Sequence, residues 1–256
     1  MEIYVELVPH GVPPERDGPP VPAPRGGSAT VVVDVLRSAT VSVLLFERGA
    51  KAVTLTPSVR AARQVAEREG AVLVGERAGV PLEGFNHGSS PSVLRGVALA
   101  ERNVVLLSDE APAALVAGAG TVVLAGLTNA VAVAELIAAA EPQEVRIVCA
   151  GDRGEPDLAD TIAAGLLVAL LDRAVRRKAN VTVSLVGAAR YCLSVLRTTK
   201  DPLDGIWAAA AAAELRSIGL EEDLAIASEV AVSDIVPRVA ACESVLSRPT
   251  VRLVAS

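Results

Sequence analysis

Aromatic residues, histidine and cysteine are all scarce in this chain of 256 residues. Phe, Trp and Tyr together make up 2% of it, and there are two His and three Cys. The cysteines, at Cys149, Cys192 and Cys242, are odd in number and far apart, so they form neither a zinc-binding spacing nor a disulfide framework. This usage is typical of a protein from a reducing compartment.

The chain also lacks a basic run, a long apolar run and a leader-like start. Its net charge is −6 and it has no cluster of arginine with aromatic residues, so we expect no nucleic-acid partner. The stretch that comes closest to a membrane span, 161–171, is short and follows acidic residues. A strand-like pattern, not a signal peptide, directly follows Met1. We therefore predict a cytoplasmic protein with no membrane partner.

Apolar residues are abundant, at 51% of the chain, and they supply a core made mostly of Val, Leu and Ala. We predict a single α/β domain over residues 1–256, in which the segment 9–27, rich in Pro and Gly, is a long irregular loop. Strand and helix patterns alternate from 29 to 177, which predicts a largely parallel sheet with helices on both faces.

The pattern places each element within a few residues. In the first part of the chain, strands are expected at 2–8, 29–33, 51–55, 71–74, 103–107, 121–125 and 144–149. Helices are expected there at 58–70, 110–116, 128–140 and 157–177. The part that follows is expected to be mainly helical, with helices at 182–196, 205–218 and 221–229 and short strands at 235–239 and 251–254.

The stretch 29–40 carries the strongest local signal. Four of the five residues from 29 to 33 are β-branched, which predicts a buried strand. The strand ends at Asp34, and Arg37 and Ser38 follow at the start of an apolar helical pattern. Open α/β sheets place ligand groups at such a junction, where the helix N-terminus also favours an anion. The alternative is that Asp34 only caps the helix and Arg37 is a surface residue.

Further polar side chains follow the other predicted strands. Glu76 and Arg77 begin a long glycine-rich loop over 75–91, and Asp160 opens the helix after the strand at 144–149. Because the carboxyl ends of parallel strands share one edge of a sheet, these groups are expected to meet Asp34. Carboxylates with arginines suit a hard cation such as Mg²⁺ together with a phosphate ester. The alternative for Glu76 and Arg77 is a solvated ion pair on a loop.

Five motifs in this order resemble those of the 2-phosphosulfolactate phosphatase (ComB) family. They cover most of the chain, from about 29 to 239, and are Asp34-Val-Leu-Arg-Ser-Ala-Thr40, Gly75-Glu-Arg-Ala-Gly79, Glu83-Gly-Phe-Asn-His-Gly-Ser-Ser-Pro91, Cys149-Ala-Gly151 and Gly219-Leu-Glu-Glu-Asp-Leu224. The resemblance implies a three-layer α/β/α fold and a Mg²⁺-dependent phosphatase that acts on 2-phosphosulfolactate or related 2-hydroxy acid phosphates.

The resemblance also suggests roles for the matching residues. Asp34 and Asp160 would hold Mg²⁺, and Glu76 would be a third ligand or the base that activates water. Arg37 and Arg77 would bind the phosphate of a small anionic ester. The other expected substrate-binding residues are Ser38, Ser90 and Asn129.

Several positions depart from the family pattern. A polar turn that contains an arginine is replaced here by 108–113, which is acidic and apolar, and a polar helical segment is replaced by the alanine run 208–213. Asn86 and Ala159 stand where the family has carboxylates, so two charges are expected to be missing from the cation site.

These departures leave a second hypothesis open, a non-catalytic homologue that kept the fold as a binding or regulatory protein. A third is an unrelated small-molecule enzyme on a doubly wound sheet, which would carry a bound nucleotide. A homodimer is a further possibility, because alanine-rich helices and an apolar C-terminal segment suit one as well as they suit internal packing.

Overall fold

The computed structural model describes residues 1–9, 27–77, 79–177 and 182–256. The loop predicted over 9–27 therefore lies almost wholly outside the described residues. Within them, one ten-stranded sheet has the order β10-β1-β9-β2-β8-β11-β12-β3-β7-β4. Its strands are β1 (Glu2–Glu6), β2 (Ser28–Val33), β3 (Ala52–Thr56), β4 (Val72–Val74), β7 (Asn103–Leu107), β8 (Thr121–Ala125), β9 (Glu144–Cys149), β10 (Ser184–Gly187), β11 (Pro237–Val245) and β12 (Arg248–Ala255).

The sheet consists of two parallel blocks joined by an antiparallel hairpin. Strands β10, β1, β9, β2 and β8 pair in parallel, and so do β3, β7 and β4. The hairpin β11–β12 lies between the blocks and pairs antiparallel with β8 on one side and β3 on the other. This mixed, largely parallel sheet confirms the predicted α/β class.

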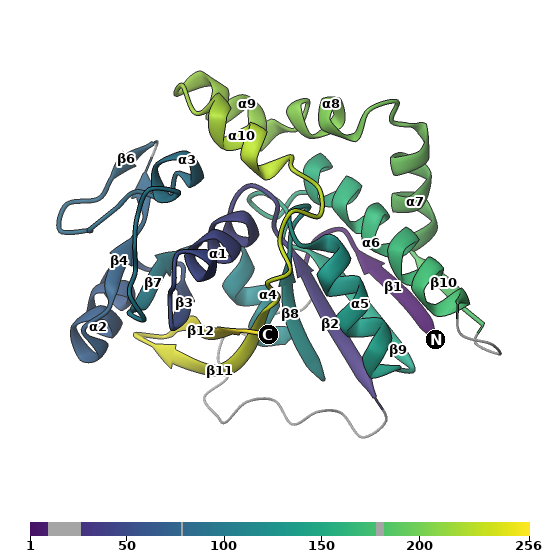
Figure 1. Cartoon of the computed structure of the whole chain (residues 1–256), viewed down its shortest axis with the longest axis horizontal. Helices are drawn as coiled ribbons and strands as arrows, with labels where there is room; N and C mark the ends of the chain where they lie inside the picture. The colour runs from purple at the N-terminus through teal and green to yellow at the C-terminus, as the bar shows by residue number, and fades with distance from the viewer. Residues whose placement is uncertain (10–26, 78, 178–181) are drawn as a thin grey trace.

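Helices cover both faces of the sheet, as Figure 1 shows. The helices of the described residues are α1 (Ser38–Glu47), α2 (Val59–Glu69), α3 (Pro91–Leu94), α4 (Ala111–Ala117), α5 (Ala130–Ala140), α6 (Leu158–Arg176), α7 (Ala189–Thr198), α8 (Pro202–Trp207), α9 (Ala210–Ser217) and α10 (Glu221–Ala227).

The alternation of side chains along β2 divides the core in two. Val31 and Val33 belong to a cluster with α5, α6 and α7, whereas Val32 packs with α1 and α4 on the other face. Similarly, Val105 of β7 packs under α2, while its neighbours Val104 and Leu106 face the second cluster. The period of two in these strands therefore produces the three-layer α/β/α arrangement.

Several helix ends follow the signals in the sequence. Ser58 caps α2 by accepting the amide of Ala61, and Gly70 ends that helix in the left-handed conformation. Asp157 caps α6 in the same way, and basic residues complement the dipole in its last turn. The predicted boundaries in the first part of the chain agree with the structure to within about three residues.

The prediction was wrong between 182 and 218. The expected helix at 182–196 is the edge strand β10 followed by α7, because residues 184–187 pair in parallel with β1 there. The expected helix at 205–218 is two helices, α8 and α9, which are separated at Ala209, where the backbone is extended. Alanine favours a helix in isolation, so tertiary packing determines this break.

Two hairpins were also missed or shortened. The strand expected at 235–239 overlaps only the start of the longer β11, and that expected at 251–254 lies inside the longer β12; the turn between β11 and β12 has positive φ at Leu246 and Ser247. Such a turn normally carries Asn or Gly, so the sequence lacked its usual signal. Within the glycine-rich loop, β5 (Glu76–Arg77) pairs with β6 (Val80–Pro81).

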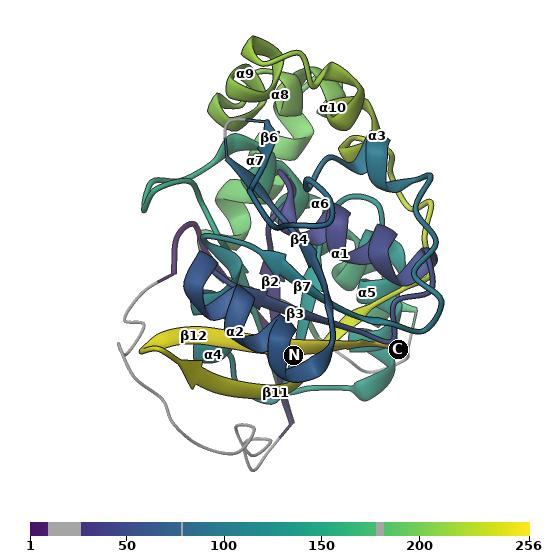
Figure 2. The same cartoon turned by 90° about the vertical axis from the view of Figure 1, so that its left-hand side faces the viewer.

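Helices α8, α9 and α10 gather at one end of the molecule, far from the hairpin β11–β12 (Figure 1, Figure 2). Among the described residues, no helix combines the length and the apolar character that a membrane span needs.

The packing of α6 against α7 gives a direct test of the fold. A Cβ at Gly165 of α6 would lie 2.9 Å from the carbonyl carbon of Cys192, in the backbone of α7. We expect Gly165→Ala to lower the free energy of unfolding by about 2 kcal/mol, because the helices must separate. Gly96→Ala is the control, since its nearest heavy atom is 3.8 Å away. Equal urea midpoints for the two variants would contradict this close packing.

Candidate functional site

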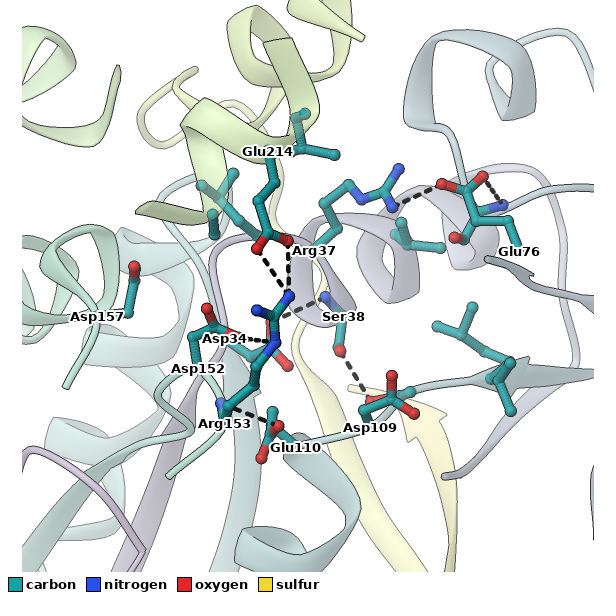
Figure 3. A pocket seen from close by; sticks show the side chains of 18 of the residues that line it. Asp34, Arg37, Ser38, Glu76, Asp109, Glu110, Asp152, Arg153, Asp157 and Glu214 are labelled. Atoms are coloured by element: carbon teal, nitrogen blue, oxygen red, sulfur yellow. Dashed lines mark hydrogen bonds and ion pairs between the residues drawn. The ribbon is translucent and has the colours of Figure 1, made fainter. Parts of the chain in front are cut away.

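A cavity of about 360 Å³ lies where the loops after β2, β7 and β9 meet. The first turn of α1, the start of the loop after β4, and one side of α9 complete its wall. Figure 3 shows acidic side chains converging from these separate elements. The cavity contains six of the eight predicted site residues: Asp34, Arg37, Ser38, Glu76, Arg77 and Asp160.

Asp34 follows the last residue of β2 and has only 7% of its surface exposed. Its Oδ1 accepts the amide of Ser38 at 3.0 Å. Asp34 therefore holds the first amide of α1 and also lines the cavity, and its role as a ligand group stays a prediction. Burial raises its pKa, against the lowering effect of the hydrogen bonds from Ser38.

The first turn of α1 also carries a hydroxyl into the cavity. The Oγ atoms of Ser38 and Ser108 are 2.8 Å apart, which joins the loop after β2 to the loop after β7. The peptide bond between Leu36 and Arg37 in this turn is cis. The short distance between the hydroxyls shows that the ends of the two parallel blocks meet at this point, although their strands are linked through antiparallel pairings.

Asp160 is almost fully buried and links two loops of the cavity. Its Oδ1 accepts the amide of Val35 at 2.9 Å, and its Oδ2 accepts the amide of Gly151 at 3.1 Å. Burial raises the pKa of Asp160 well above its ordinary value, and the nearby charge of Asp34 adds to the rise. This carboxyl group therefore fixes the loops after β2 and β9 relative to each other.

Arg37 is held between two buried carboxylates. Its guanidinium lies 2.7 Å from Glu76 Oε1 and 3.2 Å from Asp223 Oδ2. Glu76 also accepts the amide of Ser89 through Oε2 at 3.1 Å. Figure 3 shows Glu76 facing Arg37 at the edge of the cavity. Both oxygens of Glu76 are thus engaged in positioning Arg37 and the loop that contains Ser89.

Asp223, on α10, is the residue of this network that the sequence did not single out. It is fully buried, and its Oδ1 accepts the hydroxyl of Ser90 at 2.7 Å and the amide of Ser92 at 3.0 Å. Ser90 therefore reaches Arg37 through Asp223 and is not a lining residue of the cavity. The one available signal was that Asp223 lies within the motif 219–224.

The two other arginines of the cavity form exposed ion pairs. Arg77 makes two contacts with the carboxylate of Asp109, at 2.8 and 3.2 Å. Arg153 makes two contacts with Glu214 of α9, at 2.7 and 2.9 Å (Figure 3). More than half of each of these four side chains is exposed. Arg153, Asp109 and Glu214 were not among the predicted site residues.

Asn129 lies away from the cavity. Its side chain is fully buried and bonds the amide of Gly126 and the carbonyls of Leu124 and Ile235, at 2.9 to 3.2 Å. These contacts fix the end of β8 to the segment that leads to β11. Substrate binding by Asn129 stays a prediction, and the contacts that the structure gives are structural ones.

Negative charge dominates the cavity, which has eight carboxylates and three arginines in its wall. Burial raises the pKa of Glu110, and the charges of Asp109, Asp34 and Asp152 act in the same direction. The pKa of Asp157 is also raised by burial, although the amides that it caps oppose this. Carboxylates that repel one another in this way would be stabilised by a cation.

A search of known protein families gives a match over most of the chain. The sequence model described as 2-phosphosulpholactate phosphatase matches residues 21–241. The chain belongs to this family.

Relatives in several bacteria carry the name "Probable 2-phosphosulfolactate phosphatase". The chain is 36% identical to such a protein of Deinococcus radiodurans over 211 residues, which are 81% of this chain and 85% of the relative. The identity to one of Thermus thermophilus is also 36%, over 210 residues, with 81% and 86% covered. A third, from Thermosynechococcus vestitus, is 29% identical over 234 residues, with 88% and 92% covered.

Two of the departures of this family member lie outside the cavity wall. Asn86 accepts the amide of Leu73 at 2.8 Å, and Ala159, in the first turn of α6, is buried in the core. Neither residue lines the cavity, and the expectation that Asn86 and Ala159 remove two charges from a cation site stays a prediction. The replaced turn does line it, and Asp109 and Glu110 are among its carboxylates.

Proposed function

We propose that this member of the 2-phosphosulfolactate phosphatase family hydrolyses a small anionic phosphate monoester. The substrate would be 2-phosphosulfolactate or a related 2-phospho-hydroxy acid, in keeping with the names of the relatives. The observation that carries the proposal is the convergence of Asp34, Arg37 and Ser38 at the first turn of α1 in one cavity. An anion is favoured there by the helix dipole and by hydrogen-bond donors.

In this proposal the phosphate binds beside α1. The hydroxyl of Ser38 donates to a phosphate oxygen, and the guanidiniums of Arg37 and Arg77 neutralise its charge. Arg37 keeps its orientation because Glu76 and Asp223 hold it on either side. Arg77 is free to turn, since an exposed ion pair such as that with Asp109 is worth at most about 1 kcal/mol.

The cation implied by the family is Mg²⁺. The carboxylate oxygens of the cavity fit it if one side chain binds the ion and other oxygens complete its shell. Among the described residues, no three His, Cys, Asp or Glu side chains are placed to hold a metal ion together. Mg²⁺ is often held by one or two carboxylates, with water and phosphate oxygens completing its shell. We assign this role to Asp34, through its Oδ2. When bound, the cation would neutralise phosphate oxygens and acidify a water molecule.

The other predicted catalytic carboxylates have different roles in this proposal. Both oxygens of Glu76 and of Asp160 already accept hydrogen bonds, so we assign them to positioning Arg37 and the cavity loops. A proton from the attacking water requires an acceptor with a raised pKa. Glu110 and Asp157 line the cavity and meet this requirement through burial.

Phosphate release from racemic 2-phosphosulfolactate and from 2-phospholactate tests the function. We expect release in Mg²⁺ and a loss of at least about 100-fold in EDTA. Asp172→Asn is a control, because this residue lies on α6 in an exposed ion pair outside the cavity, and it should leave the rate unchanged. Folded protein that releases phosphate from neither ester at any Mg²⁺ concentration would refute the proposal.

One observation favours a non-catalytic binding protein as the second candidate. Asp109, which belongs to the replaced turn, makes two contacts with Arg77 and competes with phosphate for it. A protein of this kind would still gain thermal stability when Mg²⁺ and a phosphate ester bind. A shift in Tm with both ligands present, without phosphate release, would select this candidate.

A further inference from the structure

Arg153 differs from the other cavity arginines in what holds it. Its backbone lies in a tight turn, in which Asp152 and Glu155 exchange backbone hydrogen bonds of 2.9 Å. The amide of Arg153 also donates to Glu110 at 3.2 Å. Its side chain, by contrast, is 71% exposed and forms ion pairs with two acidic groups, Asp152 and Glu214. The turn is therefore anchored, while the guanidinium is free to change its partner.

The partner of Arg153 lies on a weakly anchored helix. Within α9 the buried residues are Ala212 and Leu215, and Glu214 is 58% exposed. Ile218, just after α9, packs on the other side of the cavity, where a Cβ at Gly79 would lie 2.9 Å from it. So little buried apolar surface gives α9 a low local stability. The helix covers the cavity between the loop after β9 and the β5–β6 hairpin.

We propose that Arg153 binds one of the two acidic groups that the substrate carries besides its phosphate, the sulfonate or the carboxylate, and that Glu214 occupies this position until the substrate displaces it. This inference rests on the proposed function and adds a specificity-determining residue to it. A planar guanidinium can take a carboxylate or a sulfonate through two parallel hydrogen bonds. With Glu214 it uses one nitrogen, since Nη2 of Arg153 donates to both carboxylate oxygens, at 2.7 and 2.9 Å, so an incoming anion can also engage the other nitrogens.

The charges of the cavity support this exchange. Arg37 already faces two buried carboxylates, and we assign Arg77 to the phosphate, so Arg153 is the lining arginine left for another anion. An acidic group that entered the cavity without a cationic partner would be repelled by the carboxylates of the wall. In Figure 3, Asp152 and Asp157 lie on one side of Ser38, and Glu76 and Asp109 lie on the other. The arginine on the side of Asp152 is Arg153.

Kinetics with two esters test the proposal. One is 2-phosphosulfolactate, and the other is isopropyl phosphate, which lacks a second acidic group. We expect Glu214→Gln to lower KM for 2-phosphosulfolactate about three-fold, because an exposed competitor is removed. Arg153→Asn should raise that KM about ten-fold or more, and Arg153→Lys should raise it less. Asn is chosen because Arg153 has a φ of +51°, which asparagine tolerates.

The same variants should leave KM for isopropyl phosphate within about two-fold of the wild type, since this ester does not reach Arg153. Asp172→Asn breaks an exposed ion pair of similar kind on α6 and should alter neither KM. Equal changes for both esters, or no change in Glu214→Gln and Arg153→Asn, would overturn the proposal.

Binding of sulfolactate, which carries no phosphate, separates this proposal from the function on which it rests. Trp207 is the single tryptophan of the chain and ends α8, directly before α9, so its fluorescence reports on this region. We expect sulfolactate to change the signal, with about three-fold tighter binding in Glu214→Gln and weaker binding in Arg153→Asn. This result without phosphate release would uphold the role of Arg153 and reject the phosphatase. Binding that ignores both substitutions would reject the role of Arg153.

Discussion

Asp34→Asn is expected to reduce phosphate release by at least about 1,000-fold and, in the absence of metal, to raise the Tm of the protein. The loss of activity follows from the proposed role of Oδ2, since an amide is a poor ligand for a hard cation and carries no charge. Fold and capping should survive, because the amide oxygen of asparagine can still accept the Ser38 amide.

The gain in stability follows from the sign of the pKa shift. Burial raises the pKa of Asp34 in the folded state, so folding favours the protonated carboxyl. The contribution of the Asp34 carboxyl group to stability is complete below its ordinary pKa of about 4, and it is lost as pH rises through the raised pKa of the folded state. The asparagine variant does not incur this loss, so its advantage over the wild type should appear as pH is raised above about 4.

Thermal unfolding in EDTA between pH 4 and 8, followed by circular dichroism, measures this difference. Asp172→Asn serves as the control, since that carboxylate is on the surface of α6 and its substitution should leave the pH dependence unchanged. A lower Tm for Asp34→Asn at every pH would mean that the charge of Asp34 is needed by the fold. The loss of activity would then say nothing about a cation.

The strand β2 and its polar end were predictable because their signals are local. β-Branched residues form the strand, and a carboxylate directly after it must lie at the sheet edge, whatever the rest of the fold. The order of alternating strands and helices placed Glu76 and Asp160 at the same edge. Sequence spacing could not show which oxygens of these residues are already bonded to backbone amides.

The contacts that complete the site come from distant parts of the chain. Asp223 is 186 residues from Arg37, and Glu214 is 61 residues from Arg153. Both lie in the segment after 177, where alanine-rich helices gave an even helical pattern and no sign of which face meets the cavity. The Mg²⁺ dependence, the homodimer and the role of Asn129 stay predictions.

The second large effect is expected from Asp223→Asn. This substitution keeps the size of the side chain and an acceptor for Ser90, but it removes the charge that faces Arg37 at 3.2 Å. Removing one partner of a buried ion pair costs roughly 3 kcal/mol or more when the other charge is left uncompensated, and here Arg37 keeps its pair with Glu76, so the cost should be about 2 kcal/mol. We expect a loss of that size in urea unfolding and a fall of at least about ten-fold in kcat/KM, since Arg37 loses its orientation.

The matched control is Glu229→Gln. Glu229 follows α10 and pairs with Arg95 at the end of α3, so it connects the same two elements as Asp223 but in an exposed pair. Its loss should cost less than about 0.5 kcal/mol and leave kcat/KM unchanged. If both variants lost stability equally and kept their activity, Asp223 would be only a tether between α3 and α10. Loss of activity in Asp223→Asn alone, at a temperature where both are folded, would assign it to positioning Arg37.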